Sequence, residues 1–174
     1  KAHEAVKAFP LREVGILNTD LWTRDAYRGM CDYLNLIHTL SLGCKPAEIS
    51  FAAPLTFNGH VNAGIVRYND LFTIYPFENQ LFVVKMTGEE IRNYLEHSYD
   101  QWINTIAKPE ETLLKIESRE DARTQQQRWS FVNRSYNFDS AAGINYTVDV
   151  TKPFGERVAI ASMADGSAFD LRKE

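Results

Sequence analysis

The sequence lacks the features that would tie the chain to a membrane or to a nucleic-acid polymer. None of its segments approaches the roughly 20 consecutive apolar residues that a membrane-spanning helix needs. Its 19 lysines and arginines are scattered among 23 acidic residues, so the net charge is −4 and no basic stripe forms. We therefore expect neither a membrane nor a nucleic-acid polymer as a partner. A single mononucleotide is compatible with these numbers, because binding it needs only a ring platform and one or two polar groups.

Cysteine is also scarce, since Cys31 and Cys44 are the only two. Two cysteines make neither a disulfide framework nor, by themselves, a metal site, and we expect two free, partly buried thiols. The sequence shows no signal peptide and begins with Lys1, so we interpret it as a mature segment or an excised domain. Its length and its 44% content of hydrophobic residues predict a single domain over residues 1–174.

Catalytic motifs are missing as well, because the sequence has no nucleophile elbow and no glycine-rich phosphate loop with a lysine. None of the four histidines stands at a metal-ligand spacing from another, and His38 and His97 are expected on helix surfaces or in packing contacts. Residues 58–60 (NGH) look superficially like a metal-binding turn of metallophosphoesterases, but the Asp-x-His and Asn-His-Asp/Glu turns of a two-metal site are absent. We assign no metal role to His60 and expect no catalytic residue in this chain.

The first half of the chain is predicted to contain one long helix. Residues 25–42 carry apolar side chains at three- and four-residue intervals, namely Met30, Tyr33, Leu34, Ile37 and Leu40. Asp25 can cap the start of this helix, and Gly43 with Pro46 can end it. Residues 48–53 (EISFAA) then indicate a short buried strand.

The middle of the chain is predicted to pass from a loop through a short helical turn to a strand. Residues 54–64 form a loop rich in glycine and asparagine. Asn69 or Asp70 can cap a helical turn that must end before Pro76. A strand over Gln80–Met86 follows, in which two valines favour extended backbone.

A helix is predicted directly after that strand. Thr87 and Glu90 have the spacing of a capping box, in which each side chain binds the other residue's backbone N–H. One side of this helix carries Ile91, Leu95, Ser98 and Trp102. Residues 107–128 are polar and charged, and they are interpreted as an exposed insertion or mobile loop, because so few apolar groups cannot offset the entropy of ordering.

The last third of the chain is predicted to form a strand pair. Residues Ile144–Val150 alternate apolar and polar side chains, Arg157–Met163 form the return strand, and residues 165–167 form a tight turn. The order of elements predicts an α+β (mixed α/β) fold, a mixed β-sheet with antiparallel hairpins packed by helices.

Aromatic residues in two turn-like segments are the remaining candidates for function. The segments IYPFEN and RSYNFDS contain Tyr75, Phe77, Tyr136 and Phe138, and each segment also carries an asparagine, Asn79 or Asn137. A flat ring beside an amide suits a nucleobase, because the ring stacks on the base and the amide reads its edge. The alternative is that these rings are core residues at strand ends.

Two longer stretches resemble the C-terminal domain of the bacterial 5′-nucleotidase / UDP-sugar hydrolase / 2′,3′-cyclic-nucleotide 2′-phosphodiesterase family. They are DLFTIYPFENQLFVVKMTGEEIRNYLEHS and SYNFDSAAGINYTVDVTKPFGERV. The first has the family's Pro-Phe-x-Asn, strand and Thr-Gly-x-Glu helix, and the second has its Gly-Ile-x-Tyr-x-x-Asp…Pro-x-Gly-x-Arg strand pair. Weaker similarity extends back to about residue 25.

The resemblance implies a division of labour between domains. An N-terminal metallophosphoesterase domain, outside this chain, would hold two divalent metals and perform hydrolysis, and this domain would bind the nucleotide substrate. The family's stacking ring carries over to Phe77 and its base contact to Asn79; Tyr75 and the loop with Arg134, Tyr136 and Asn137 would line the same pocket. The resemblance also implies a periplasmic, secreted or cell-surface protein.

Three departures from the family pattern leave alternatives open. The family's second stacking ring lies in an Asn-Gly-Gly segment beyond this sequence, so we expect a C-terminally truncated specificity domain with half of the base clamp and an unpaired sheet position. The family's Gly-Gly-Gly-Ile-Arg is replaced by AAPLTFNG, which resembles the cyclic-phosphodiesterase/3′-nucleotidase branch and leaves Arg67 or Arg28 as candidates for the phosphate. The catalytic metal motifs are absent.

The other class of function is a non-catalytic interaction module that keeps the fold without binding nucleotide, and another ligand such as a nucleotide sugar or dinucleotide also fits.

Overall fold

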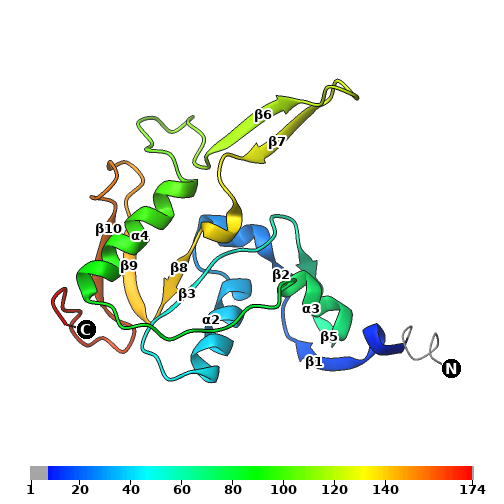
Figure 1. The fold of residues 1–174 in the computed structure, drawn as a ribbon, viewed down its shortest axis with the longest axis horizontal. Coiled ribbons are helices and arrows are strands. Elements are labelled where there is room, and N and C mark those ends of the chain that lie inside the picture. The colour runs from blue at the N-terminus through cyan, green and yellow to red at the C-terminus, as the bar shows by residue number, and fades with distance from the viewer. Residues whose placement is uncertain (1–7, 174) are drawn as a thin grey trace.

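The computed structural model describes residues 8–173, and its strands are joined in five two-stranded antiparallel ladders (Figure 1). The ladders in the first half are β1 (Glu13–Leu17) with β5 (Gly64–Arg67) and β2 (Leu21–Trp22) with β4 (His60–Val61). Those in the second half are β6 (Ile116–Glu120) with β7 (Gln127–Phe131) and β9 (Ile144–Val148) with β10 (Val158–Met163). The fifth ladder, between β3 (Ser50–Ala52) and β8 (Ser140–Ala142), joins the two halves. The predicted α+β class is confirmed.

The predicted helix over residues 25–42 is wrong at both ends. The structure has a short 3₁₀ helix, η2 (Thr23–Arg28), and then α2 (Asp32–Cys44). Gly29 separates them with a φ of 138°, a backbone conformation that a side chain disfavours and a helix cannot contain. The buried face of α2 is made by Tyr33, Leu34, Ile37 and His38, whereas Met30 and Leu40 are exposed. The apolar periodicity predicted one continuous helix, because it gives no sign of the break at Gly29.

The helical turn before Pro76 is confirmed as α3 (Tyr68–Ile74), although it begins earlier than predicted. The residue before its first turn is Arg67, and the Asp70 carboxylate accepts the Arg67 backbone N–H at 2.7 Å. At the other end, the buried Tyr33 hydroxyl donates to the Ile74 carbonyl oxygen at 3.0 Å. The end of α3 is therefore tied to α2 directly before the YPFEN turn.

The predicted strand over Gln80–Met86 is not part of any ladder among residues 8–173. Its four central side chains, Leu81 to Val84, are all exposed, and Phe82 is the most exposed at 75%. Valine and phenylalanine favour extended backbone, but a strand also needs a hydrogen-bonded neighbour, and sequence pattern does not supply one. The segment lies opposite residues 41–51 across a groove of about 710 Å³.

The capping box at the start of α4 (Gly88–Trp102) is confirmed. The Thr87 hydroxyl accepts the Glu90 backbone N–H at 3.3 Å, and the Glu90 carboxylate accepts the Thr87 backbone N–H at 2.7 Å. The predicted apolar side of α4 is buried at Ile91, Leu95, Ser98 and Trp102. The local sequence signal was sufficient here because both partners of the box lie within four residues.

The polar insertion is exposed, as predicted, but it is not without structure. Residues 107–128 include all of β6 and the start of β7, which pair in register from Ile116–Phe131 to Glu120–Gln127. Figure 1 shows this hairpin extending away from the rest of the molecule. Most of its side chains are exposed, so backbone hydrogen bonds and cross-strand pairs hold it rather than a core.

A buried carboxylate fastens α4 to the β9–β10 hairpin. Glu96 is 1% exposed, and its two oxygens accept the backbone N–H groups of Val158 at 2.6 Å and Gly155 at 2.8 Å. Beside it, the buried Arg157 guanidinium donates to Asp100 at 3.0 Å and to Thr105 at 2.7 Å. The predicted strands at 144–150 and 157–163 are thus confirmed, and α4 packs across them (Figure 1).

Two apolar clusters form the core. The larger one gathers α4, β8, β9 and β10 around Leu95, Trp102 and Phe138, and the smaller one gathers α2, β2 and α3 around Leu34 and Ile74. None of the helices among residues 8–173 is long and apolar enough to cross a bilayer.

We predict that Glu96→Gln destabilises the domain by about 2–4 kcal/mol, because an amide offers one acceptor where two backbone N–H groups need partners. Urea denaturation measures this loss. The matched control is Glu89→Gln, the same change at an exposed position in the first turn of α4. Equal stability of the two variants would contradict the role of Glu96.

We also predict a pH dependence of stability that comes from His38. Burial lowers the pKa of His38 from the ordinary 6.5 to about 4, while its Nδ1 lies 3.0 Å from the Ser50 hydroxyl. Between pH 6.5 and 4 the unfolded chain therefore binds a proton at His38, whereas the folded protein does not. Stability consequently falls as the pH drops through this window, by up to roughly 3 kcal/mol. Denaturation midpoints of wild type and His38→Gln should diverge at pH 7 and converge toward pH 4. Parallel curves would show that His38 does not titrate in this way.

Candidate functional site

Four of the six predicted site residues line one groove. This groove, called the aromatic groove below, has a volume of about 750 Å³ and includes Tyr75, Phe77, Asn79 and Tyr136. One wall comes from α2 and the end of β3, the second from residues 71–81, and the third from the loop around η3 (Ser135–Asn137). Segments that are 60 residues apart in sequence therefore face a single space.

The second wall is built on the YPFEN turn. The Asn79 amide donates to the Tyr75 hydroxyl at 3.0 Å, which fixes the amide at the edge of the groove and leaves its oxygen available. Because Ile74 is anchored by Tyr33, the turn begins from a fixed point. Pro76 then prevents the helix from continuing, so the chain turns outward at Phe77.

The rings of the groove are more exposed than core rings. Phe77 is 50% exposed, Tyr136 is 54% exposed and Tyr75 is 39% exposed, although all three are large apolar groups. Phe138, which the sequence placed in the same class, is fully buried and stacks on Trp102 at 5.5 Å between ring centroids. The alternative that these rings are core residues thus holds for Phe138 alone among the four.

The groove carries a single charged side chain, Asp139. The Tyr94 hydroxyl donates a short hydrogen bond to its carboxylate, and the Ser98 hydroxyl donates to its backbone oxygen at 2.7 Å. Burial raises the pKa of the Asp139 carboxyl above its ordinary value, while the bond from Tyr94 acts against that rise. Lysine, arginine and histidine are absent from the residues that line the groove.

Two predicted site residues do not line the groove. Arg134 and Asn137 lie in the correct loop, but neither belongs to the lining, and the Asn137 backbone oxygen faces Ser98 at 3.4 Å. The two arginines considered for the phosphate are also elsewhere. Arg67 precedes α3, and Arg28 lines a different cavity.

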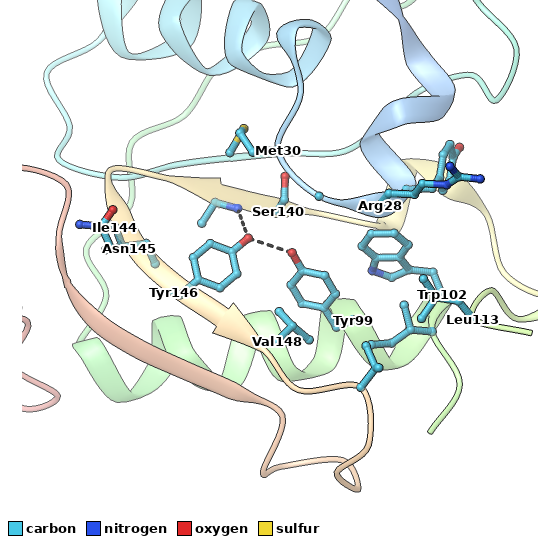
Figure 2. A pocket seen from close by; sticks show the side chains of 15 residues that line it. Arg28, Met30, Tyr99, Trp102, Leu113, Ser140, Ile144, Asn145, Tyr146 and Val148 are labelled. Carbon is cyan, nitrogen blue, oxygen red and sulfur yellow. Dashed lines mark hydrogen bonds between the residues drawn. The ribbon is translucent and has the colours of Figure 1, made fainter. Parts of the chain in front are cut away.

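That second cavity has a volume of about 500 Å³ and lies between α4, β8, β9 and the loop after η2 (Figure 2). Within it, the Tyr146 hydroxyl accepts the Ala141 backbone N–H at 3.1 Å and lies 2.9 Å from the Tyr99 hydroxyl. Arg28 stands at its edge, and Figure 2 shows the guanidinium directed away from the two phenol rings. Apart from the phosphate candidate Arg28, this cavity contains none of the predicted site residues, so the aromatic groove, which contains four of them, is the better candidate site.

The comparison with known families decides which fold this is. The model of the 5′-nucleotidase C-terminal domain matches residues 13–174, which is nearly the whole chain. The chain belongs to this family. The resemblance stated from the sequence is therefore confirmed.

Curated relatives of this 5′-nucleotidase C-terminal domain are nucleotide phosphoesterases. A 2′,3′-cyclic-nucleotide 2′-phosphodiesterase/3′-nucleotidase from Haemophilus influenzae is 33% identical over 96 residues, covering 53% of this chain and 12% of the relative. The trifunctional nucleotide phosphoesterase YfkN of Bacillus subtilis is 31% identical over 96 residues, covering 54% of this chain and 6% of the relative. The chain thus spans only a small part of these relatives.

Solved 5′-nucleotidase structures share the fold. A 5′-nucleotidase precursor from Thermus thermophilus superposes with a TM-score of 0.68 at 21% identity, over 97% of this chain and 29% of that protein. A Staphylococcus aureus structure described as a 5′-nucleotidase with α-ketoglutarate gives 0.72 at 20% identity, over 98% and 31%. At these identities the comparison establishes the fold.

The described part of this family member does not fit a metal site. Across residues 8–173, no three histidine, cysteine, aspartate or glutamate side chains lie close enough together to hold an ion. His60 instead stacks on Trp22, with ring centroids 3.6 Å apart, and lies 3.3 Å from Asp20. Both cysteines are free, but Cys44 is exposed at the groove rather than partly buried.

Sequence reasoning missed Asp139 and the wall made by α2. A lone aspartate in a turn is typical of loops and carries no signal of its own. Its position matters only because β8, which follows at Ser140, pairs with β3 and so carries the turn to the groove. Leu40 was counted as helix packing and Cys44 only as a partly buried thiol, and their place in the groove likewise depends on the fold.

Proposed function

We propose that this domain recognises the nucleotide substrate of a metal-dependent phosphoesterase that hydrolyses 2′,3′-cyclic nucleotides, nucleoside monophosphates, or both. The observation that carries the proposal is the aromatic groove, which holds two half-exposed rings and an oriented amide. Soluble domains seldom leave large rings exposed together around a concave surface unless that surface binds something.

Phe77 and Asn79 are proposed as the ring platform and the reader of the base. Stacking on an aromatic ring contributes roughly 1–3 kcal/mol per base. Tyr136, on the opposite loop, offers a second ring within the same chain. One face of the base can then be stacked by Phe77 and the other by Tyr136, without a ring from a later segment. Tyr75 acts indirectly, by holding the Asn79 amide.

The phosphate is proposed to lie outside the groove. A phosphate needs cationic or N–H donors. The groove lining contains no lysine, arginine or histidine, and its one carboxylate would repel a phosphate. The groove therefore suits the nucleoside end of the substrate. Binding energy from this unreactive end can orient the phosphate toward a catalytic centre elsewhere.

We propose that the catalytic centre belongs to an N-terminal metallophosphoesterase domain of the same polypeptide. The curated relatives are many times longer than the part this chain matches, which leaves room for such a domain. Its two divalent metals would activate water and stabilise the charged phosphoryl group. We further propose an extracytoplasmic location, periplasmic, secreted or on the cell surface, as the precursor name of the Thermus relative suggests for that protein.

Phe77→Ala in the full-length protein should weaken the binding of AMP roughly 5- to 150-fold, because a stacking contact is lost. Isothermal titration measures the dissociation constant. Stability should change by less than about 1 kcal/mol, since the ring is half exposed. Phe82→Ala is the matched control, because Phe82 is exposed and lies outside the groove. If Phe77→Ala instead costs about 3–5 kcal/mol of stability, the ring is a core residue and the site assignment fails.

Phosphate release by the full-length protein with Mn²⁺ or Co²⁺ tests the substrate class. We expect turnover of 2′,3′-cyclic AMP, with a phosphatase added to release phosphate from its product, and of 3′-AMP, with little turnover of 5′-AMP. The reason is that AAPLTFNG lacks the arginine of the 5′-nucleotidase branch. Activity confined to 5′-AMP would reverse this assignment. No activity on any of the three, with metals bound, would favour a non-catalytic interaction module.

A further inference from the structure

We infer that Asp139 is the hydrogen-bond acceptor that selects the nucleoside in the aromatic groove, by accepting from an N–H or O–H donor of the ligand. The inference rests on the proposed function, because it assigns a further residue to the same groove. It adds a specificity element that the stacking rings do not provide, since every nucleobase has a face on which a ring can stack.

The first argument is that Asp139 is held in place from outside the groove. Tyr94 on α4 donates to one carboxylate oxygen, and Ser98, one turn further along α4, donates to the backbone oxygen of the same residue. The Tyr94 ring is itself fixed edge-on against Phe51, at 4.8 Å between centroids. A carboxylate held at two points loses little freedom when a ligand binds, which is what a selective contact requires.

The second argument is chemical. A carboxylate bound by one hydroxyl keeps further acceptor positions, because two oxygens offer about four lone-pair sites. Ser41 and Gln80, which also line the groove, are neutral and can turn to donate or to accept, whereas the Asn79 amide nitrogen is already bound to Tyr75. An ionised Asp139 can only accept, so it is the one charged group in the groove that rejects a ligand edge without a donor.

The third argument concerns where the donor lies on the ligand. A nucleoside has two sources, the exocyclic amino or ring N–H groups of the base and the hydroxyls of the ribose. In a 2′,3′-cyclic nucleotide the 2′ and 3′ hydroxyls are esterified, so only the base or the free 5′ hydroxyl could donate in that substrate. A donor at the 2′ or 3′ position would instead favour substrates in which that hydroxyl is free. The identity of the donor therefore bears on the substrate class.

The test compares how nucleosides bind to the full-length protein with its metals, because nucleosides carry no phosphate and are not hydrolysed. The probes are adenosine, purine riboside (which lacks the amino group), 2′-deoxyadenosine, 3′-deoxyadenosine and 5′-deoxyadenosine. A hydrogen bond to a charged group implies that wild type prefers adenosine roughly tenfold or more over at least one analogue. Preference over purine riboside identifies a base donor, and preference over a deoxynucleoside identifies a ribose donor.

Asp139→Asn should bring that preference close to one, and Glu120→Gln, the same kind of change on the distant β6–β7 hairpin, should leave it unchanged. Tyr94→Phe keeps the ring against Phe51 but removes the donated bond, and it should reduce the preference while leaving stacking intact. This second variant decides the matter if Asp139→Asn does not fold.

The role of Asp139 is overturned if the preference for adenosine survives in the folded variants. It is also overturned if wild type binds adenosine but shows no preference for it over any analogue. If wild type binds none of the five nucleosides and Phe77→Ala leaves the binding of AMP unchanged, the proposed function is overturned instead.

Discussion

The short ladder between β3 and β8 is the contact on which the candidate site depends. It joins residues 50–52 to residues 140–142, and the Ser140 hydroxyl lies 3.4 Å from the Ala52 carbonyl oxygen across it. The close approach continues at Gly143, where a φ of 97° and the adjacent Glu48 carbonyl leave no room for a side chain. Because β8 directly follows the loop around η3, this ladder carries Tyr136 and Asp139 to the YPFEN turn. Without it the wall around η3 would not be held against the other two walls of the groove.

Burial divides the aromatic residues into two groups with different roles. Tyr27, Trp102, Phe131 and Phe138 contact one another in the larger core cluster, where they stabilise the fold through buried apolar area. Tyr75, Phe77 and Tyr136 are 39–54% exposed and contribute less to stability. Rings that the fold does not need for its own packing are available to a ligand.

Charge in the groove complements the division of labour proposed for the family. A nucleotide is an anion, yet the groove that suits its base carries only a carboxylate. Such a surface does not bind the whole substrate by attraction of opposite charges. Under the proposed function it would bind the neutral end and leave the phosphate to groups that lie elsewhere. A domain built in this way would determine which substrate is bound, while a neighbouring centre would perform the chemistry.

The sequence alone determined those features whose causes are local. The capping box at Thr87 and Glu90, the buried side of α4, the end of α3 before Pro76 and the strands around Tyr146 and Ile160 all follow from residues a few positions apart. The resemblance then led to the family and to the rings of the groove. The tertiary structure decided the rest. It broke the first helix at Gly29, left residues 80–86 without a ladder partner among the described residues, buried Phe138 beside an exposed Tyr136, and placed Asp139 in the groove. The break at Gly29 comes from the backbone conformation of that glycine, which apolar periodicity does not reveal. The other outcomes depend on contacts with segments distant in the sequence, and the pattern within one segment does not show which segments will lie beside it.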